Sequence, residues 1–126
     1  MILGVDIGGT TIKFGLVDEK GEIVKKYRID TPVGQGDTAI VNALIEKIWQ
    51  IQGEYDFDRI GIGTPGTADY DTGVCIRASN LPYKNTPLGP MVREAIGKPV
   101  DLFNDAACAV GAELYVGLGR EYKNIL

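Results

Sequence analysis

The chain has 126 residues, of which 44% are hydrophobic and 24% are charged, and this composition fits one globular domain. Its formal net charge of −4 argues against general binding to nucleic acids or acidic membranes, for which a basic surface is expected. Two cysteines are too few for a disulfide scaffold, and without any histidine the chain has no zinc-site spacing.

The chain opens with a predicted hairpin, because two β-branched, apolar runs at residues 2–7 and 11–17 flank a pair of glycines. Asp6 interrupts the first run, where a buried charge is costly unless something pairs with it. This stretch favours phosphate binding. It combines backbone N–H groups left free by the glycines with two hydroxyls, a lysine and a carboxylate that can bind a metal. The alternative is a structural hairpin in which Asp6 hydrogen-bonds to the turn. The residues of this set are Asp6, Gly8, Gly9, Thr10, Thr11 and Lys13.

Two other glycine motifs that bind phosphate do not fit this turn. Gly4 and Gly9 have the glycine spacing of a P-loop, but Thr10 stands where that motif needs a lysine. Residues 11–14 are β-branched or aromatic apart from a lysine, so they continue as a strand and do not start a helix. The glycines also lack the G-x-G-x-x-G spacing of a dinucleotide-binding fold.

A third strand, a loop and a long helix are predicted next. The strand, with a polar outer edge, is expected at residues 23–29 and the loop at 31–36. We expect Asp37 to be the N-cap of a helix that runs to Gly53. The apolar stripe of this helix consists of Ile40, Val41, Leu44, Ile45, Ile48 and Ile51.

The second half of the chain is predicted to alternate strands and helices. The expected elements are strands at 59–63 and 100–103, a short extended segment at 74–76, a polar loop at 78–85, and helices from 86 or 89 to 96 and from Asp105 onward. Gly97 and Pro99 end the first of these helices. This order predicts an α/β fold: a mixed sheet of about five strands, the three N-terminal ones antiparallel, with helices on its faces.

Polar groups gather where the predicted strands end, and ligands of such sheets bind in the loops beyond the strand ends. The segments concerned are Asp6 to Thr11, Thr64 to Gly66, Ser79-Asn80 and Asn104-Asp105. The start of a helix favours the ionised carboxylate of Asp105, which could then accept a proton from an attacking hydroxyl. Asn104 could bond to the hydroxyls of a polyol. An ordinary helix N-cap is the alternative role of Asp105.

These motifs resemble those of the ROK family, which contains sugar kinases and sugar-responsive repressors. The resemblance rests on the run from Asp6 to Lys13, Gly61-Ile62-Gly63-Thr64-Pro65-Gly66, Asn80-Leu81-Pro82, Leu102-Phe103-Asn104-Asp105-Ala106, and Glu113. The motifs occur in family order across essentially the whole chain, and the closest likeness is to the glucokinases. The resemblance implies an actin-like, ribonuclease-H-like ATPase fold for residues 1–120.

The resemblance also implies a role for each matching residue. The hairpin would hold the β- and γ-phosphates of ATP, with Asp6 near Mg²⁺ through water. Gly66, Asn80 and Asn104 would line the hexose pocket together with Asp105, the catalytic base that takes the proton from the sugar hydroxyl. These roles fit phosphoryl transfer, in which positioning and charge neutralisation supply most of the acceleration.

Three positions depart from the family pattern. Ala107 stands where the family often has an asparagine after Asn-Asp-Ala. Ser79 replaces a frequent proline, and Tyr83 lies where many members have a tryptophan. These differences leave the identity of the sugar open.

Residues 121–126 read like the start of a second domain. The family's second phosphate loop, adenosine site, Glu-x-Gly-His sugar motif and cysteine-rich zinc motif would lie further on, so these residues supply no structural zinc site. We therefore expect an N-terminal fragment of a cytoplasmic kinase that has hexose and ATP as partners and binds neither nucleic acid nor membrane. An uncovered apolar surface would make it a homodimer or a self-associating fragment. Without a basic leader or a long apolar run, no signal peptide is expected.

Two rival functions stay open: a sugar-sensing regulator of the same family without catalysis, and an actin-like ATPase. The regulators place a helix-turn-helix ahead of the hairpin, which begins here at residue 2. An actin-like ATPase should lack the sugar-loop residues Asn80 and Asn104-Asp105.

Overall fold

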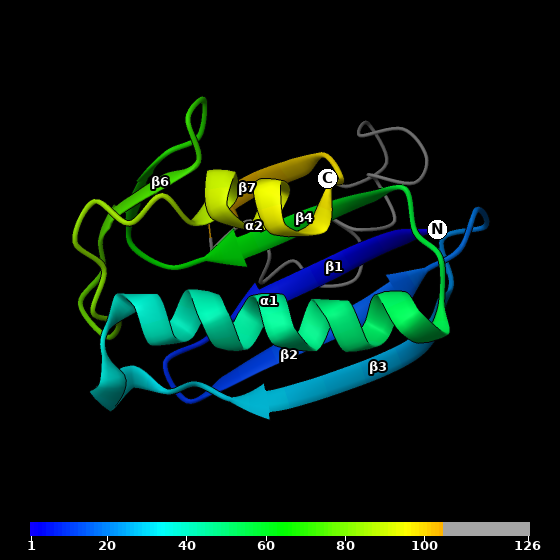
Figure 1. Cartoon of the computed structure of the whole chain (residues 1–126), viewed down its shortest axis with the longest axis horizontal. Coiled ribbons are helices and arrows are strands. Elements are labelled where there is room, and N and C mark those ends of the chain that lie inside the picture. The colour runs from blue at the N-terminus through cyan, green and yellow to red at the C-terminus, as the bar shows by residue number, and fades with distance from the viewer. Residues whose placement is uncertain (105–126) are drawn as a thin grey trace.

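A five-stranded mixed sheet forms the centre of the structure, a computed structural model that describes residues 1–104 (Figure 1). In sheet order the strands are β3 (Ile23–Asp30), β2 (Thr11–Val17), β1 (Ile2–Ile7), β4 (Arg59–Thr64) and β7 (Val100–Asn104). β1, β2 and β3 are antiparallel neighbours, whereas β4 is parallel to both β1 and β7. The mixed sheet and its three antiparallel N-terminal strands were predicted correctly.

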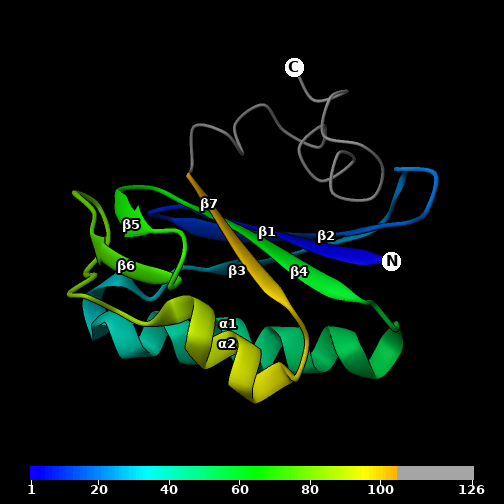
Figure 2. The same cartoon turned by 90° about the horizontal axis from the view of Figure 1, so that it is seen from above.

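Both helices of the described residues, α1 (Asp37–Glu54) and α2 (Leu88–Ile96), pack on the same face of this sheet (Figure 2). A short 3₁₀ turn, η1 (Val33–Gln35), precedes α1. The whole predicted apolar stripe of α1 is buried, and each such aliphatic side chain contributes roughly 1.5–3 kcal/mol through burial. Gly97 ends α2 in the left-handed conformation, as its position predicted. Neither of these helices has the length and hydropathy that a membrane span requires.

The start of α1 differs from the prediction by one residue. Gly36 is the N-cap, with a φ of 93°, and Asp37 is already the first helical residue. Glycine adopts this backbone conformation without steric cost, so the chain can enter the helix one residue early. The carboxylate of Asp37 accepts hydrogen bonds from the Thr38 N–H at 2.8 Å and from the Thr86 hydroxyl at 2.6 Å. It therefore ties α1 to the segment just before α2.

A small two-stranded sheet, β5 (Thr67–Asp69) and β6 (Val74–Arg77), follows β4. The extended segment at 74–76 was predicted, but β5 has only three residues and shows no pattern that distinguishes it from a loop. Cys75 and Thr86 exchange two backbone hydrogen bonds, which close the loop at 78–85 against β6. This loop was expected to be polar, yet Leu81 and Tyr83 within it are buried.

The helix predicted from Asp105 onward lies outside the described residues. So do Ala107, Cys108 and Glu113, and the domain boundary expected at 121–126.

Candidate functional site

The carboxyl ends of the parallel strands β1, β4 and β7 meet at one edge of the sheet. Asp6 of β1 lies opposite Gly63 of β4, and Thr64 of β4 lies opposite Asn104 of β7. The segments that follow these strands therefore share one edge, as expected from their positions in the sequence. Asp105 would follow Asn104 directly but lies outside the described residues.

Gly8 and Gly9 form the tight turn between β1 and β2. The Gly8 N–H donates to the carbonyl oxygen of Thr11 at 2.9 Å, and a Cβ on Gly8 would lie equally close to that oxygen. Thr31, just after β3, makes two hydrogen bonds to this turn. Its hydroxyl donates to the Gly8 carbonyl at 2.8 Å, and its N–H donates to the Thr10 carbonyl at 2.9 Å. Thr31 is buried, and sequence reasoning missed it, because only its position after a strand marks it.

Charge at this turn comes from Asp6 and Lys13, which lie directly opposite each other on β1 and β2. Opposed residues of an antiparallel pair project from the same face of the sheet. Asp6 is half-buried, whereas Lys13 and Thr10 are exposed and Thr11 is half-buried. Within residues 1–104, no three acidic, cysteine or histidine side chains gather into a metal site. A single carboxylate fits Mg²⁺, because Mg²⁺ keeps several waters and binds to substrate phosphates.

Asn80 joins the polar loop at 78–85 to this turn. A methyl group built on Gly9 would lie 2.8 Å from Asn80 Nδ2, so the amide packs directly against the glycine. The predicted sugar-binding asparagine and the predicted phosphate-binding turn are therefore in contact. Asn80 itself is exposed.

Gly66 occupies the turn after β4, with a φ of 93°. A Cβ there would overlap the carbonyl oxygen of Arg77 and would lie 2.6 Å from the Cβ of Ala78. The 64–66 turn thus packs against the end of β6, just where the 78–85 loop begins. Only glycine fits this position, on both steric and backbone grounds.

A buried hydrogen bond connects the same two segments below the surface. Thr64 Oγ1 and the Tyr83 hydroxyl lie 2.6 Å apart, and the two residues are 1% and 4% exposed. The Tyr83 hydroxyl also donates a hydrogen bond to the Cys75 sulfur, which lowers the pKa of this thiol, but burial has the larger effect and raises it to about 11. Sequence reasoning noted Tyr83 only as a departure from the family pattern. Its partner, Thr64, was named among the polar residues at strand ends, but no sequence pattern paired it with Tyr83.

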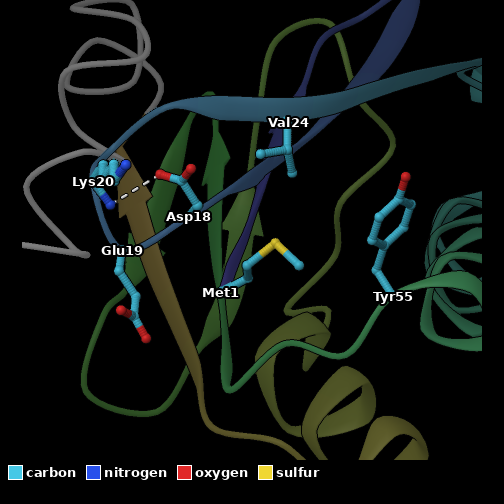
Figure 3. Close-up of a pocket in the computed structure, with 6 residues that line it drawn as sticks. All are labelled: Met1, Asp18, Glu19, Lys20, Val24 and Tyr55. Carbon is cyan, nitrogen blue, oxygen red and sulfur yellow. Dashed lines mark hydrogen bonds between the residues drawn. The ribbon is translucent and has the colours of Figure 1, made fainter.

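A pocket on the described part of the chain lies at the opposite, amino-terminal end of β1 (Figure 3). Its lining residues are Met1, Asp18, Glu19, Lys20, Val24 and Tyr55. The only hydrogen bond drawn among them joins the Lys20 N–H to Asp18 Oδ1 at 2.9 Å. This pocket includes none of the predicted site residues, and those within residues 1–104 lie at the other end of β1.

Comparison with known proteins relates this chain to one protein family. A model of the ROK family matches residues 2–126. The glucokinase of Thermotoga maritima is 36% identical over 126 residues, covering 99% of this chain and 40% of that protein. The chain thus spans about 40% of the length of this relative.

Two solved structures share its fold. A ROK family glucokinase from Streptomyces griseus, in complex with glucose and AMPPNP, has a TM-score of 0.80 at 33% identity, covering 95% of this chain and 38% of that one. A ROK family transcriptional regulator, a homologue of the E. coli MLC protein, has a TM-score of 0.79 at 24% identity, covering 90% of this chain and 30% of that one. The second likeness shows a common fold alone.

Proposed function

The chain belongs to the ROK family, as its motifs predicted, and from this premise we propose that it is the N-terminal part of an ATP-dependent hexose kinase. The relative named above and the more similar of the two structures are glucokinases, so glucose is the proposed acceptor. The observation that carries the proposal is the contact between Asn80 and Gly9. It places the segment proposed to bind sugar against the turn proposed to bind phosphate, as transfer between the two ligands requires. We further propose that residues 1–120 are the first domain of the kinase and that a second domain begins within 121–126.

The hairpin turn is proposed to bind the β- and γ-phosphates of ATP. Gly8 and Gly9 carry no side chains, so phosphate oxygens can approach the backbone of the turn closely. The Gly8 N–H already donates to the Thr11 carbonyl within the turn, so the proposed backbone donor is the N–H of Gly9. The hydroxyls of Thr10 and Thr11 add further donors, and Lys13 adds positive charge on the face that also carries Asp6. Bound Mg²⁺ would neutralise phosphate charge, with Asp6 as its protein contact through water.

The sugar is proposed to lie between Gly66, Asn80 and Asn104. Amide side chains suit this role because each offers both donors and an acceptor to neighbouring hydroxyls. Asp105 then accepts the proton of the attacking hydroxyl as its oxygen bonds to the γ-phosphorus. The bond between that phosphorus and the β–γ bridging oxygen breaks, and ADP leaves with the electron pair.

A phosphorylation assay on the full-length protein tests this function. ATP would be offered with glucose, mannose, fructose and N-acetylated amino sugars, and we expect the highest kcat/KM with glucose. Asp105→Asn should lower kcat by at least about a hundredfold, the usual contribution of a general base, while glucose binding measured by calorimetry persists. Asp71→Asn, in an exposed turn, is the control. Retained turnover in Asp105→Asn would refute the proposed role of Asp105 as catalytic base. If the protein phosphorylates none of the sugars, the proposed kinase function is refuted.

The same assay separates the rival functions. Glucose binding without phosphorylation would indicate a sugar-sensing regulator, whose fold is the same. ATP hydrolysis that no sugar stimulates would indicate an actin-like ATPase. We also propose that residues 1–126 alone phosphorylate hexose poorly, and turnover near that of the full-length protein would contradict this.

A further inference from the structure

Tyr83 connects the loop at 78–85, which carries Asn80, to the end of strand β4. Its hydroxyl lies 2.6 Å from Thr64 Oγ1, and both residues are almost fully buried. Thr64 is the last residue of β4 and pairs with Asn104 of β7, and the preceding residue, Gly63, pairs with Asp6 of β1. The bond therefore fixes the loop to a point that the sheet holds in place.

Two proposed sugar contacts lie close to the ends of this bond in sequence. Gly66 follows Thr64 by two residues, and Asn80 precedes Tyr83 by three. Leu81 and Tyr83 are the buried residues nearest to the exposed Asn80 on its C-terminal side. Without this bond the loop keeps its buried Leu81 and the two backbone bonds between Cys75 and Thr86, but it loses its side-chain tie to β4 on the C-terminal side of Asn80.

We infer that the Tyr83 hydroxyl is a positioning group for the hexose, through its buried bond to Thr64, and that its loss weakens sugar binding more than nucleotide binding. The inference rests on the proposed kinase function. A buried hydrogen bond contributes about 1 kcal/mol, so if it acts on the equilibrium between the anchored, sugar-binding loop and the unanchored loop, its loss corresponds to about fivefold in glucose affinity. The role differs from general stabilisation, because it acts more strongly on the sugar than on ATP.

The test compares variants of the full-length protein by steady-state kinetics. Tyr83→Phe should raise the KM for glucose about fivefold and leave the KM for ATP and kcat within twofold of wild type. Thr64→Val removes the same bond from the other side and should have the same effect, while Thr64→Ser keeps a hydroxyl and should retain most of the affinity. The double variant should be little worse than either single one, because both remove one bond. Tyr70→Phe, at an exposed tyrosine, is the matched control.

An unchanged KM for glucose in Tyr83→Phe would overturn the inference, and so would equal rises in both KM values. If Tyr83→Phe does not fold, the pair Thr64→Val and Thr64→Ser decides the question in the same way. A wild-type protein that phosphorylates no hexose overturns the proposed function and this inference with it. An active wild type with an unaffected Tyr83→Phe overturns the inference alone.

Discussion

The side-chain amide of Asn80 lies against the α-carbon of Gly9, with no room for a methyl group between them. The two residues are 71 positions apart (80 − 9) and come from different loops at the carboxyl edge of the sheet. Because the contact is direct, a substitution in the hairpin turn should shift Asn80 and change sugar binding even when no nucleotide is bound.

Gly9→Ala tests this contact. The new methyl group would lie 2.8 Å from Asn80 Nδ2, so the amide must move. We expect glucose binding in the absence of nucleotide to weaken by about tenfold, or about 1.4 kcal/mol, measured by calorimetry on the full-length protein. Gly34→Ala is the matched control, because nothing lies within 4 Å of a Cβ at that position. An effect of Gly9→Ala that persists undiminished in an Asn80→Ala background would contradict this explanation.

Thr31→Val should destabilise the turn between β1 and β2. The substitution keeps the shape of the side chain but removes the hydroxyl that donates to the Gly8 carbonyl at 2.8 Å. We expect the free energy of unfolding to fall by about 1 kcal/mol, as for a typical lost hydrogen bond. The KM for ATP should rise as well, because the turn is the proposed phosphate site. Thr31→Ser retains the donor and should behave like wild type in urea titrations and in the kinase assay. If Thr31→Ser is as damaged as Thr31→Val, the methyl group and not the hydrogen bond is responsible.

Stability should depend on pH through Asp37. The hydrogen bond from the Thr86 hydroxyl, helped by the Thr38 N–H, lowers the pKa of this carboxyl below its ordinary value. A carboxyl whose pKa is lower in the folded than in the unfolded state stabilises the fold above its unfolded pKa, and this contribution is lost as the pH falls through the folded pKa. Asp37→Asn should therefore lower stability near neutral pH and flatten its decline between about pH 5 and pH 2. Urea titrations across that range measure the effect. Glu46→Gln, at an exposed position of the same helix, should leave the slope unchanged.

Cys75 should resist alkylation in the folded protein. Its side chain is fully buried, and burial raises the pKa of the thiol to about 11, so little reactive thiolate forms at pH 8. Iodoacetamide labelling followed by peptide mass spectrometry should find Cys75 protected in native buffer and labelled in strong urea. In Tyr83→Phe the protection should persist, because the hydrogen bond from Tyr83 lowers the pKa of the thiol and its loss leaves burial, which raises that pKa, unopposed. Equal labelling in buffer and in urea would show that the thiol is accessible.

Local sequence patterns were enough to predict the sheet, the apolar stripe of α1 and the segments that meet at the carboxyl edge. Those features depend on side-chain periodicity and on the parallel course of β1, β4 and β7. The contacts that shape the site were not predictable in this way. Thr31 to Gly8, Thr64 to Tyr83, and Asn80 to Gly9 each join residues at least 19 positions apart, and no local pattern specifies such pairs. The N-cap was misplaced by one residue because Gly36 takes a positive φ and caps α1, while the carboxylate of Asp37 bonds to Thr86, 49 residues away.

The central position of β1 has a consequence for the newly synthesised chain. β1 can pair with β2 as soon as residue 17 is available, but its other edge has no partner until β4 at 59–64 has been made. During that interval the edge of β1 that later pairs with β4 has unsatisfied backbone N–H and C=O groups. Such an edge can pair with strands of other chains. The order in which strands emerge during translation therefore leaves this protein exposed to aggregation while residues 18–64 are made, a few seconds at typical elongation rates.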